Sequence, residues 1–165
     1  RGKNKWIVVS ATRLYELNLP SWSILRTVLV IGIAEDLSRS NIVLWAKGAL
    51  EKGQPINVVD DQFRTPTLAE DLAQGALLAA DQCAQGVFNI SGPDFMSIYD
   101  LVGQVAAYFG LSMESVTRTD STTLNQPAKR PPRTGFDISK ARKELGYEPH
   151  TFNQALEIIA NQAGL

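Results

Sequence analysis

The chain has 165 residues, of which 44% are hydrophobic and 20% are charged, and its formal net charge is −1 at neutral pH. A chain of this size buries roughly 70% of its unfolded surface, so it can form one domain with a real core. The balanced charge argues against nucleic acid as a partner. The longest apolar run, residues 27–33, is too short to cross a bilayer, so we expect no membrane span.

Cysteine and histidine occur once each in the chain, as Cys83 and His150. A single cysteine excludes an internal disulfide, and its alanine-rich surroundings predict a small core residue. One histidine without further histidines or cysteines predicts no metal site. The basic first residues are not followed by a cleavage-site pattern, so we expect a cytoplasmic protein.

Apolar periodicity and turn residues predict helices and strands that alternate along the chain. Helices are expected at residues 5–17, 40–52, 68–84, 98–109, 137–145 and 153–163, and strands at residues 22–30, 54–59, 86–90 and 115–118. Such alternation is typical of an α/β fold.

Three finer expectations concern burial and loops. The nearly continuous hydrophobicity of residues 24–33 predicts a strand that is buried on both faces. In the helix at 68–84, the inward side chains are expected to be Leu72, Ala76, Leu77 and Ala80, and the tryptophans Trp6, Trp22 and Trp45 are expected in the core. The loop of residues 119–134 holds three prolines, and loops of this length are usually functional or disordered.

Arg64 lies between a predicted strand that ends in acids and a predicted helix. Its planar guanidinium can bind two phosphate oxygens at once. A second group of cations occurs at Lys129-Arg130-Pro131-Pro132-Arg133, on a stiff proline-containing segment. Two arginine sites that are distant in sequence suggest a clamp for a diphosphate. In the alternative interpretation, Arg64 forms a surface ion pair with Asp60 or Asp71.

Other polar residues are interpreted as structural. Asp60 and Asp61 are expected at a solvated strand end rather than as an acid and base pair. Asn89 and Ser91 precede a Gly-Pro turn and are expected to hydrogen-bond to the backbone. No Gly-x-Gly-x-x-Gly motif occurs, so the chain is either not a cofactor protein or the later part of one.

Several motifs occur in a characteristic order. They are Ser23-Ile24-Leu25-Arg26-Thr27, Asp60-Asp61-Gln62-Phe63-Arg64-Thr65-Pro66 with Glu70-Asp71-Leu72-Ala73, Asn89-Ile90-Ser91-Gly92, Arg130-Pro131-Pro132, and Asp137-Ile138-Ser139-Lys140 continuing to Pro149. This set resembles the carboxy-terminal part of the extended short-chain dehydrogenase/reductase family. It is most similar to the dTDP-4-dehydrorhamnose-reductase-like branch, which reduces sugar nucleotides with NAD(P)H.

The resemblance implies a fold of class α/β, with the last strands and helices of a Rossmann-type parallel sheet plus a small α/β substrate-binding lobe. Residues 1–165 would be the carboxy-terminal part of such a reductase, with the amino-terminal dinucleotide-binding half absent. Arg64 and Arg130 would approach the diphosphate of a nucleotide-sugar substrate. NAD or NADP would serve the intact protein, and a homodimer is one candidate assembly.

The first residues match a family motif only in part. Family members carry Tyr-x-x-x-Lys before the strand equivalent to residues 22–30, and here Lys5 stands at the lysine position with Arg1 at the tyrosine position. The resemblance gives Lys5 a catalytic and cofactor-binding role, whereas a solvated lysine at a helix start is the alternative. An arginine stays protonated and cannot serve as the proton donor.

We therefore expect the sugar-nucleotide-binding part of an NAD(P)-dependent oxidoreductase that acts on a nucleotide-activated 4-keto sugar. The isolated chain should be inactive, because it lacks the glycine-rich loop and the tyrosine. An epimerase or dehydratase of the same family and a non-catalytic ligand-binding or regulatory homologue remain the alternatives.

Overall fold

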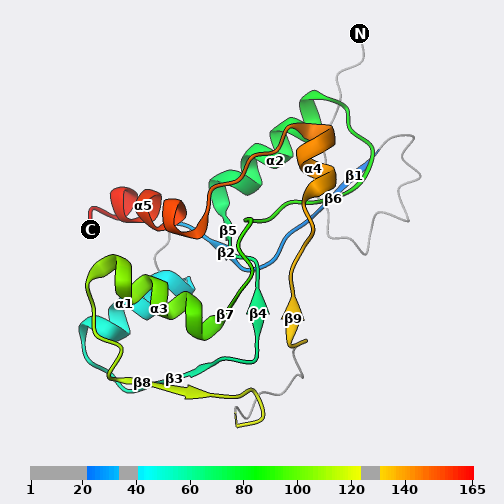
Figure 1. The fold of residues 1–165 in the computed structure, drawn as a ribbon. Coiled ribbons are helices and arrows are strands. Elements are labelled where there is room, and N and C mark those ends of the chain that lie inside the picture. Colours follow the sequence, from blue (N-terminus) through cyan, green and yellow to red (C-terminus); the bar gives the residue numbers. More distant parts are fainter. Residues whose placement is uncertain (1–21, 34–40, 124–130) are drawn as a thin grey trace.

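A computed structural model describes residues 22–33, 41–123 and 131–165, and it has the mixed α/β architecture that the sequence predicts (Figure 1). The helices are α1 (Ile42–Glu51), α2 (Ala69–Asp81), α3 (Ile98–Phe109), α4 (Ser139–Leu145) and α5 (Phe152–Ala163). The strands are β1 (Ser23–Arg26), β2 (Val30–Ile31), β3 (Ile56–Val59), β4 (Phe63–Arg64), β5 (Thr67–Leu68), β6 (Gly86–Asn89), β7 (Met96–Ser97), β8 (Val116–Thr119) and β9 (Arg133–Thr134).

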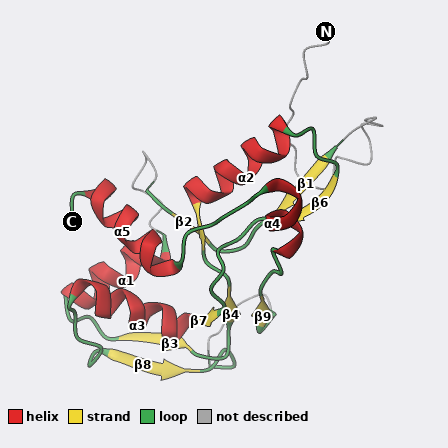
Figure 2. Cartoon of the chain, turned by 45° about the horizontal axis from the view of Figure 1, so that its top comes forward, coloured by secondary structure: helices red, strands yellow, loops and turns green. Residues whose placement is uncertain are grey.

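Parallel pairing dominates the described strands. The pairs β1–β6, β2–β5 and β3–β8 are all parallel, and β3 and β8 run together below α3 in Figure 2. The remaining sheet has the order β7–β4–β9, in which β4 is antiparallel to β7 and parallel to β9. These pairings join segments that are far apart in the sequence, so the strands are linked by long crossover connections.

The predicted strand at 22–30 is interrupted in the structure. It divides into β1 and β2, and Leu29 between them has a left-handed backbone with φ of 49°. The expectation of burial on both faces is wrong, because most of β1 is half-buried, Arg26 is exposed, and Trp22 is 45% exposed. Within the described part, β1 pairs with β6 alone.

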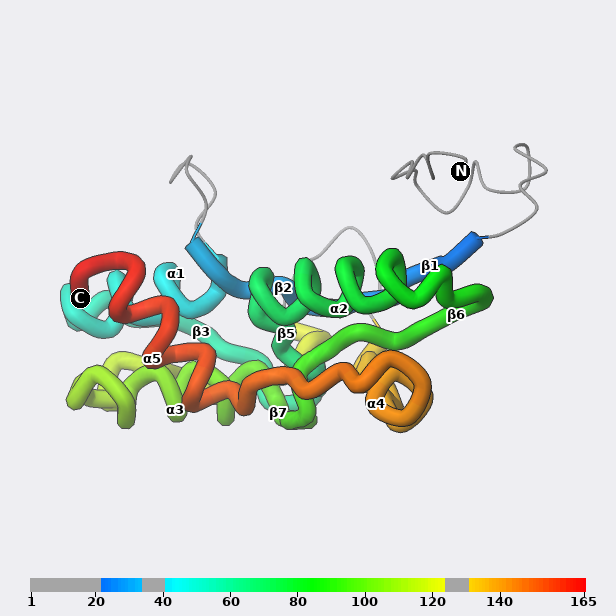
Figure 3. Tube along the Cα trace, turned by 90° about the horizontal axis from the view of Figure 1, so that it is seen from above, coloured from blue at the N-terminus to red at the C-terminus, as the bar shows by residue number. Residues whose placement is uncertain are grey.

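Two hydrophobic clusters support these strands. The larger one includes residues of α1, α3 and α5, and Figure 3 shows α5 lying over α1 and α3. The smaller one joins α2, α4 and β6 around Phe88, Ile90 and Tyr147. Strand β4 belongs to neither cluster and is held through its pairing with β7 and β9.

The buried face of α2 differs from the one predicted. Ala76 and Leu77 are exposed, and the buried residues of the helix are Asp71, Gly75 and Ala79. A Cβ atom added to Gly75 would lie 2.7 Å from Cγ2 of Ile90. The helix therefore approaches β6 through its smallest side chains, a contact that apolar periodicity cannot indicate.

The residues that the sequence predicts at helix ends cap those helices in the structure. Ser97 accepts a hydrogen bond from the Asp100 amide at the start of α3, and Gly110 ends that helix with left-handed backbone angles. Gly146 ends α4 in the same way.

Cys83 and Trp45, expected in the core, are both exposed. No helix in the described ranges is long and apolar enough to span a membrane.

Candidate anion-binding site at strand β4

Strand β4 lies between two segments that come much later in the chain. Phe63 is in register with Arg133 of β9, and Arg64 is in register with Thr134. The Phe63 amide also donates to the carbonyl oxygen of Pro132 at 2.7 Å. The structure thus places the Arg64 motif beside Pro132, Arg133 and Thr134.

The guanidinium of Arg64 is anchored by neutral acceptors. Nη1 donates to the carbonyl oxygens of Phe63 at 2.7 Å and Pro132 at 3.2 Å, and Nη2 donates to Oε1 of Gln62 at 3.2 Å. Gln62 is itself buried, so its position is fixed by packing. These three hydrogen bonds help to orient the guanidinium.

The two acids named as alternative partners of Arg64 are held by other residues. Asp60 pairs with Arg118, and this hydrogen bond raises the pKa of the Arg118 guanidinium above its ordinary value. The buried carboxylate of Asp71 accepts from the His150 backbone amide at 2.9 Å, and its Oδ1 lies 2.6 Å from His150 Nδ1. Asp60 and Asp71 thus each have a partner other than Arg64.

Asp61 is also fixed rather than solvated. Both of its carboxylate oxygens lie 3.1 Å from the amide nitrogen of Ser121, and Oδ2 accepts from the Ser121 hydroxyl at 2.5 Å. Asp60 and Asp61 are both half-buried, so the expectation of a freely solvated strand end is corrected. Each acid has its own partner, which agrees with the prediction that they are not an acid and base pair.

Arg133 is held against aromatic rings on the same small sheet. Its guanidinium carbon lies 4.5 Å from the ring centroid of Phe63 and 5.1 Å from that of Phe95. The two ring centroids are 5.5 Å apart. A Cβ atom on Gly135 would lie 2.6 Å from Phe95, so only glycine leaves room for this ring. Sequence reasoning missed Phe95 and Gly135, because neither belongs to a recognised motif.

The Asn89–Gly92 loop is structural, as expected. Asn89 Nδ2 donates to the carbonyl oxygen of Asp137 at 3.0 Å, and the Ser91 hydroxyl donates to the Gly92 carbonyl oxygen at 3.1 Å. Both side chains therefore hydrogen-bond to the backbone.

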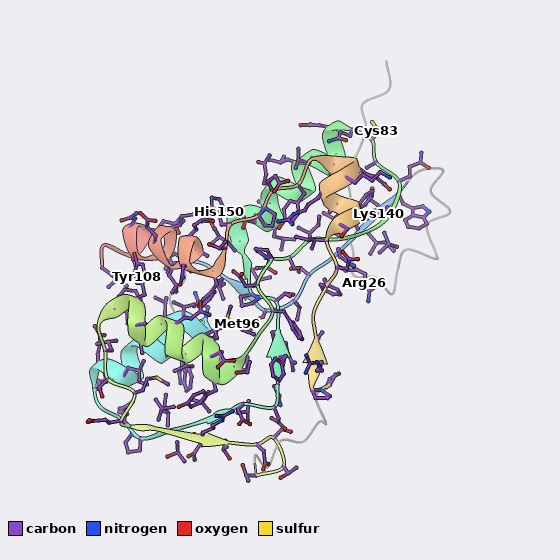
Figure 4. All side chains as sticks on the ribbon, viewed as in Figure 1. Arg26, Cys83, Met96, Tyr108, Lys140 and His150 are labelled. Atoms are coloured by element: carbon purple, nitrogen blue, oxygen red, sulfur yellow. The ribbon has the colours of Figure 1, made fainter. Side chains whose placement is uncertain are left out.

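Met96, the β7 partner of Arg64, lies close to the centre of the molecule (Figure 4).

Two predicted site residues, Lys5 and Arg130, lie outside the described residues, as does Arg1. Their roles stay predictions. Arg130 is two positions before Pro132, whose carbonyl oxygen accepts from both Phe63 and Arg64.

The start of helix α2 is unsuited to the pyrophosphate of a dinucleotide. Helix α2 begins with Glu70 and Asp71, whose negative charge disfavours a pyrophosphate at that helix start. The sequence has no glycine-rich strand-turn-helix motif. Among the described residues there is also no group of three or more histidine, cysteine, aspartate or glutamate side chains that could hold a metal ion.

Comparison with known proteins identifies a family over nearly the whole chain. A family model described as the RmlD substrate binding domain matches residues 1–164. The probable low-salt glycan biosynthesis reductase Agl14 of Haloferax volcanii is 26% identical over 141 residues, which cover 85% of this chain and 47% of that protein. The spore coat polysaccharide biosynthesis protein SpsK of Bacillus subtilis is 27% identical over 94% of this chain and 51% of its own length. The chain thus spans about half the length of these relatives.

Solved structures share the fold. A dTDP-4-dehydrorhamnose reductase from Clostridium acetobutylicum superposes with a TM-score of 0.77 and 23% identity, over 87% of this chain and 49% of that one. A UDP-glucuronic acid 4-epimerase from Bacillus cereus, in complex with UDP-glucuronic acid and NAD, gives a TM-score of 0.66 at 25% identity, over 84% and 44% of the two chains.

Proposed function

Because the chain belongs to the RmlD substrate-binding-domain family, we propose that it is the nucleotide-sugar-binding part of an NAD(P)-dependent reductase acting on a nucleotide-activated 4-keto sugar. The observation that supports this proposal is the pairing of β4 with β9, which joins Arg64 to the segment that follows Arg130. Two arginines on adjoining segments are suited to a diphosphate, since each guanidinium can donate two parallel hydrogen bonds to phosphate oxygens.

The surroundings of Arg64 favour recognition of an anion. Hydrogen bonds to the carbonyl oxygens of Phe63 and Pro132 and to Gln62 orient the guanidinium before a ligand arrives, so less side-chain entropy is lost on binding. The proposed clamp consists of Arg64 on β4 and Arg130 on the segment leading into β9. Its role is to hold the diphosphate, so that the sugar ring is presented to a reaction centre elsewhere in the protein.

The proposal extends to the rest of the protein. Residues 1–165 would be the carboxy-terminal part of a longer reductase whose dinucleotide-binding half lies outside this sequence, and that half would bind NAD or NADP. Lys5 remains the proposed lysine of the reaction centre, on the spacing of the family motif alone. A cytoplasmic location and a homodimeric assembly belong to the same proposal.

Calorimetric titration of the purified protein with UDP and dTDP tests the clamp. Arg64→Ala and Arg130→Ala should each weaken binding about tenfold to a hundredfold, since a charge-assisted hydrogen bond contributes about 1.5–3 kcal/mol. The double variant should lose less than the sum of the two losses, because both side chains grip one diphosphate.

Arg142→Ala is the matched control. Arg142 is an exposed arginine on α4 whose Nε lies 3.8 Å from Glu148, so its removal changes net charge equally without touching β4. It should leave the affinity unchanged. If Arg64→Ala binds both nucleotides as well as Arg142→Ala does, the diphosphate clamp is wrong.

An epimerase is the second candidate, favoured by the likeness to the UDP-glucuronic acid 4-epimerase of Bacillus cereus. The two reactions differ in their use of cofactor. A reductase consumes one NAD(P)H for each sugar converted, whereas an epimerase returns its cofactor to the starting state. Assaying the intact protein for net NADPH oxidation with a dTDP-4-keto sugar separates them, and no turnover of either kind would favour a ligand-binding homologue.

A further inference from the structure

An open pocket of about 520 Å³ lies between the β6–β7 loop, helix α3 and the start of helix α5. Its volume falls within the range of small-molecule sites. The lining residues are Pro93, Asp94, Phe95, Met96, Gln104, Thr151 and Asn153. Arg64 is not among these lining residues, but the pocket adjoins the candidate anion site, because Phe95 contacts Arg133 and Met96 pairs with Arg64.

Phe95 supplies an aromatic wall that is already held in place. Its ring contacts Phe63, lies under the Arg133 guanidinium, and fills the space that a side chain at position 135 would take. Even so, Phe95 is 43% exposed. A rigid and accessible ring can stack against the apolar C–H face of a sugar with little loss of side-chain entropy.

Polar side chains that line the pocket have further hydrogen-bonding groups. Asp94 Oδ2 accepts from the Phe152 amide at 2.6 Å, which leaves Oδ1 as an acceptor. Gln104 Nε2 lies 3.6 Å from Sδ of Met96, which leaves its carbonyl oxygen as an acceptor. The exposed carboxamide of Asn153, in the first turn of α5, both donates and accepts.

The charge of the lining selects the class of ligand. Among the described lining residues, none is lysine or arginine and the one charged side chain is Asp94, so a phosphate or carboxylate beside Asp94 would be repelled. Hydroxyl groups can donate to Asp94 and Gln104 and accept from Asn153. We propose that this pocket binds a neutral saccharide, through stacking on Phe95 and hydrogen bonds to Asp94, Gln104 and Asn153.

NMR titration of the isotopically labelled protein tests this assignment, with methyl α-D-glucopyranoside and methyl β-D-galactopyranoside as probes. At least one glycoside should give saturable shifts at Phe95, Gln104 and Asn153, with a Kd of about 1–10 mM, which is typical of an open site with few contacts. Glucose 6-phosphate should bind more weakly than the matched neutral sugar, because Asp94 repels its phosphate. Equal or tighter binding of the phosphorylated sugar at these residues would overturn the proposal.

Asn153→Ala and Asn161→Ala form a matched pair on helix α5. Both remove an exposed asparagine from the same helix, but only Asn153 lines the pocket. Asn153→Ala should weaken glycoside binding about threefold to tenfold, the effect of one lost hydrogen bond, and Asn161→Ala should leave it unchanged. Equal affinities in the two variants would overturn the proposal, as would the absence of saturable shifts up to about 50 mM glycoside, well above the expected Kd.

A nucleotide titration distinguishes failure here from failure of the proposed function. UDP affinity should be the same in Asn153→Ala and in the unmodified protein. If glycosides do not bind while UDP affinity depends on Arg64, the pocket assignment fails and the diphosphate clamp stands. If glycosides bind and UDP does not, the clamp fails and the saccharide pocket stands. If Asn153→Ala weakens UDP binding, the pocket is part of the nucleotide site and the proposal of a separate saccharide site is wrong.

Discussion

Gly92 packs so closely against Pro66 that an added Cβ atom would lie 2.1 Å from the Pro66 carbonyl oxygen. Gly92 belongs to the loop after β6, and Pro66 comes two residues after Arg64. The backbone of the Asn89–Gly92 loop therefore packs directly against the backbone of the segment that contains Arg64. Only a residue without a side chain permits this approach, which helps to fix the segment that carries Arg64.

Gly92→Ala should therefore destabilise the protein. The added methyl group must displace backbone atoms, and overpacking of this kind typically lowers the free energy of unfolding by about 1–3 kcal/mol or more. Gly103→Ala is the control, because an added Cβ in the middle of α3 meets nothing within 4 Å. That variant should gain about 0.5–1 kcal/mol from better helix propensity. In urea unfolding, the midpoint of Gly92→Ala should fall below that of the unmodified protein, and the midpoint of Gly103→Ala should rise above it. Equal midpoints for the two variants would contradict the close contact of Gly92 with Pro66.

Thr65→Val should leave stability unchanged or increase it. Thr65 is 3% exposed, and its hydroxyl has no hydrogen-bond partner in the part of the chain that the structure describes. A buried hydroxyl without a partner reduces stability by about 1–3 kcal/mol, and valine has nearly the same shape. Thr67→Val is the comparison, since the Thr67 hydroxyl donates to the Val28 carbonyl oxygen at 3.0 Å. Thermal unfolding should rank Thr67→Val below Thr65→Val, and the reverse order would count against the assignment.

Stability should fall at alkaline pH because of Tyr147. Burial, and then the negative charge of Asp71, raise the pKa of its phenol, which donates to the Ser91 carbonyl oxygen at 3.2 Å. Above the unfolded pKa of about 10, the folded state retains a proton that the unfolded state has lost, so the free energy of unfolding decreases as pH rises.

Tyr147→Phe should be less stable near neutral pH, by about 1 kcal/mol for the lost hydrogen bond, but its stability should depend less on pH above about 10. Tyr108→Phe, which changes an exposed tyrosine, should retain the pH dependence of the unmodified protein. Urea unfolding at several pH values between 8 and 11 measures both slopes. Parallel curves for Tyr147→Phe and the unmodified protein would show that another group controls the alkaline loss.

Arg133→Ala should destabilise the protein more than Arg142→Ala does. Arg133 lies over two aromatic rings, and a cation above a ring contributes about 0.5–1 kcal/mol at an exposed site. Arg142 has only a surface ion pair with Glu148, and such pairs contribute little. Denaturant midpoints of the two variants provide the comparison. Equal losses would mean that the ring contacts do not stabilise β9.

The sequence was most informative where structure depends on local chemistry. Ser97, Gly110 and Gly146 were correctly assigned to helix ends, because capping involves residues only a few positions apart. The pairing of the Arg64 motif with the proline segment was anticipated for a different reason. A guanidinium can bind two phosphate oxygens, so two arginine sites that are distant in sequence suggested one shared diphosphate.

Burial was predicted less well. Leu77 and Trp22 are apolar but exposed, whereas Gly75 and Asp71 are buried on α2. Glycine at a close helix contact has no signature in an apolar pattern, and a buried carboxylate becomes plausible only once its distant partner is known. The contact of Phe95 with Gly135 joins two loop residues 40 positions apart, so no local signal could indicate it.

The position of β4 between β7 and β9 also determines when the anion site can form during folding. Arg64 pairs with Met96 of β7 on one side and with Thr134 of β9, 70 positions later in the chain, on the other. Both pairings require that these later residues have already been synthesised. Strands β4, β7 and β9 have two residues each, so their pairings are too short to be stable alone. They depend on the packing of the two hydrophobic clusters around them. Contacts this distant in sequence slow folding, since loop closure precedes any gain from the contact. During synthesis, the pairing of β4 with β9 therefore cannot form before residue 134 has left the ribosome.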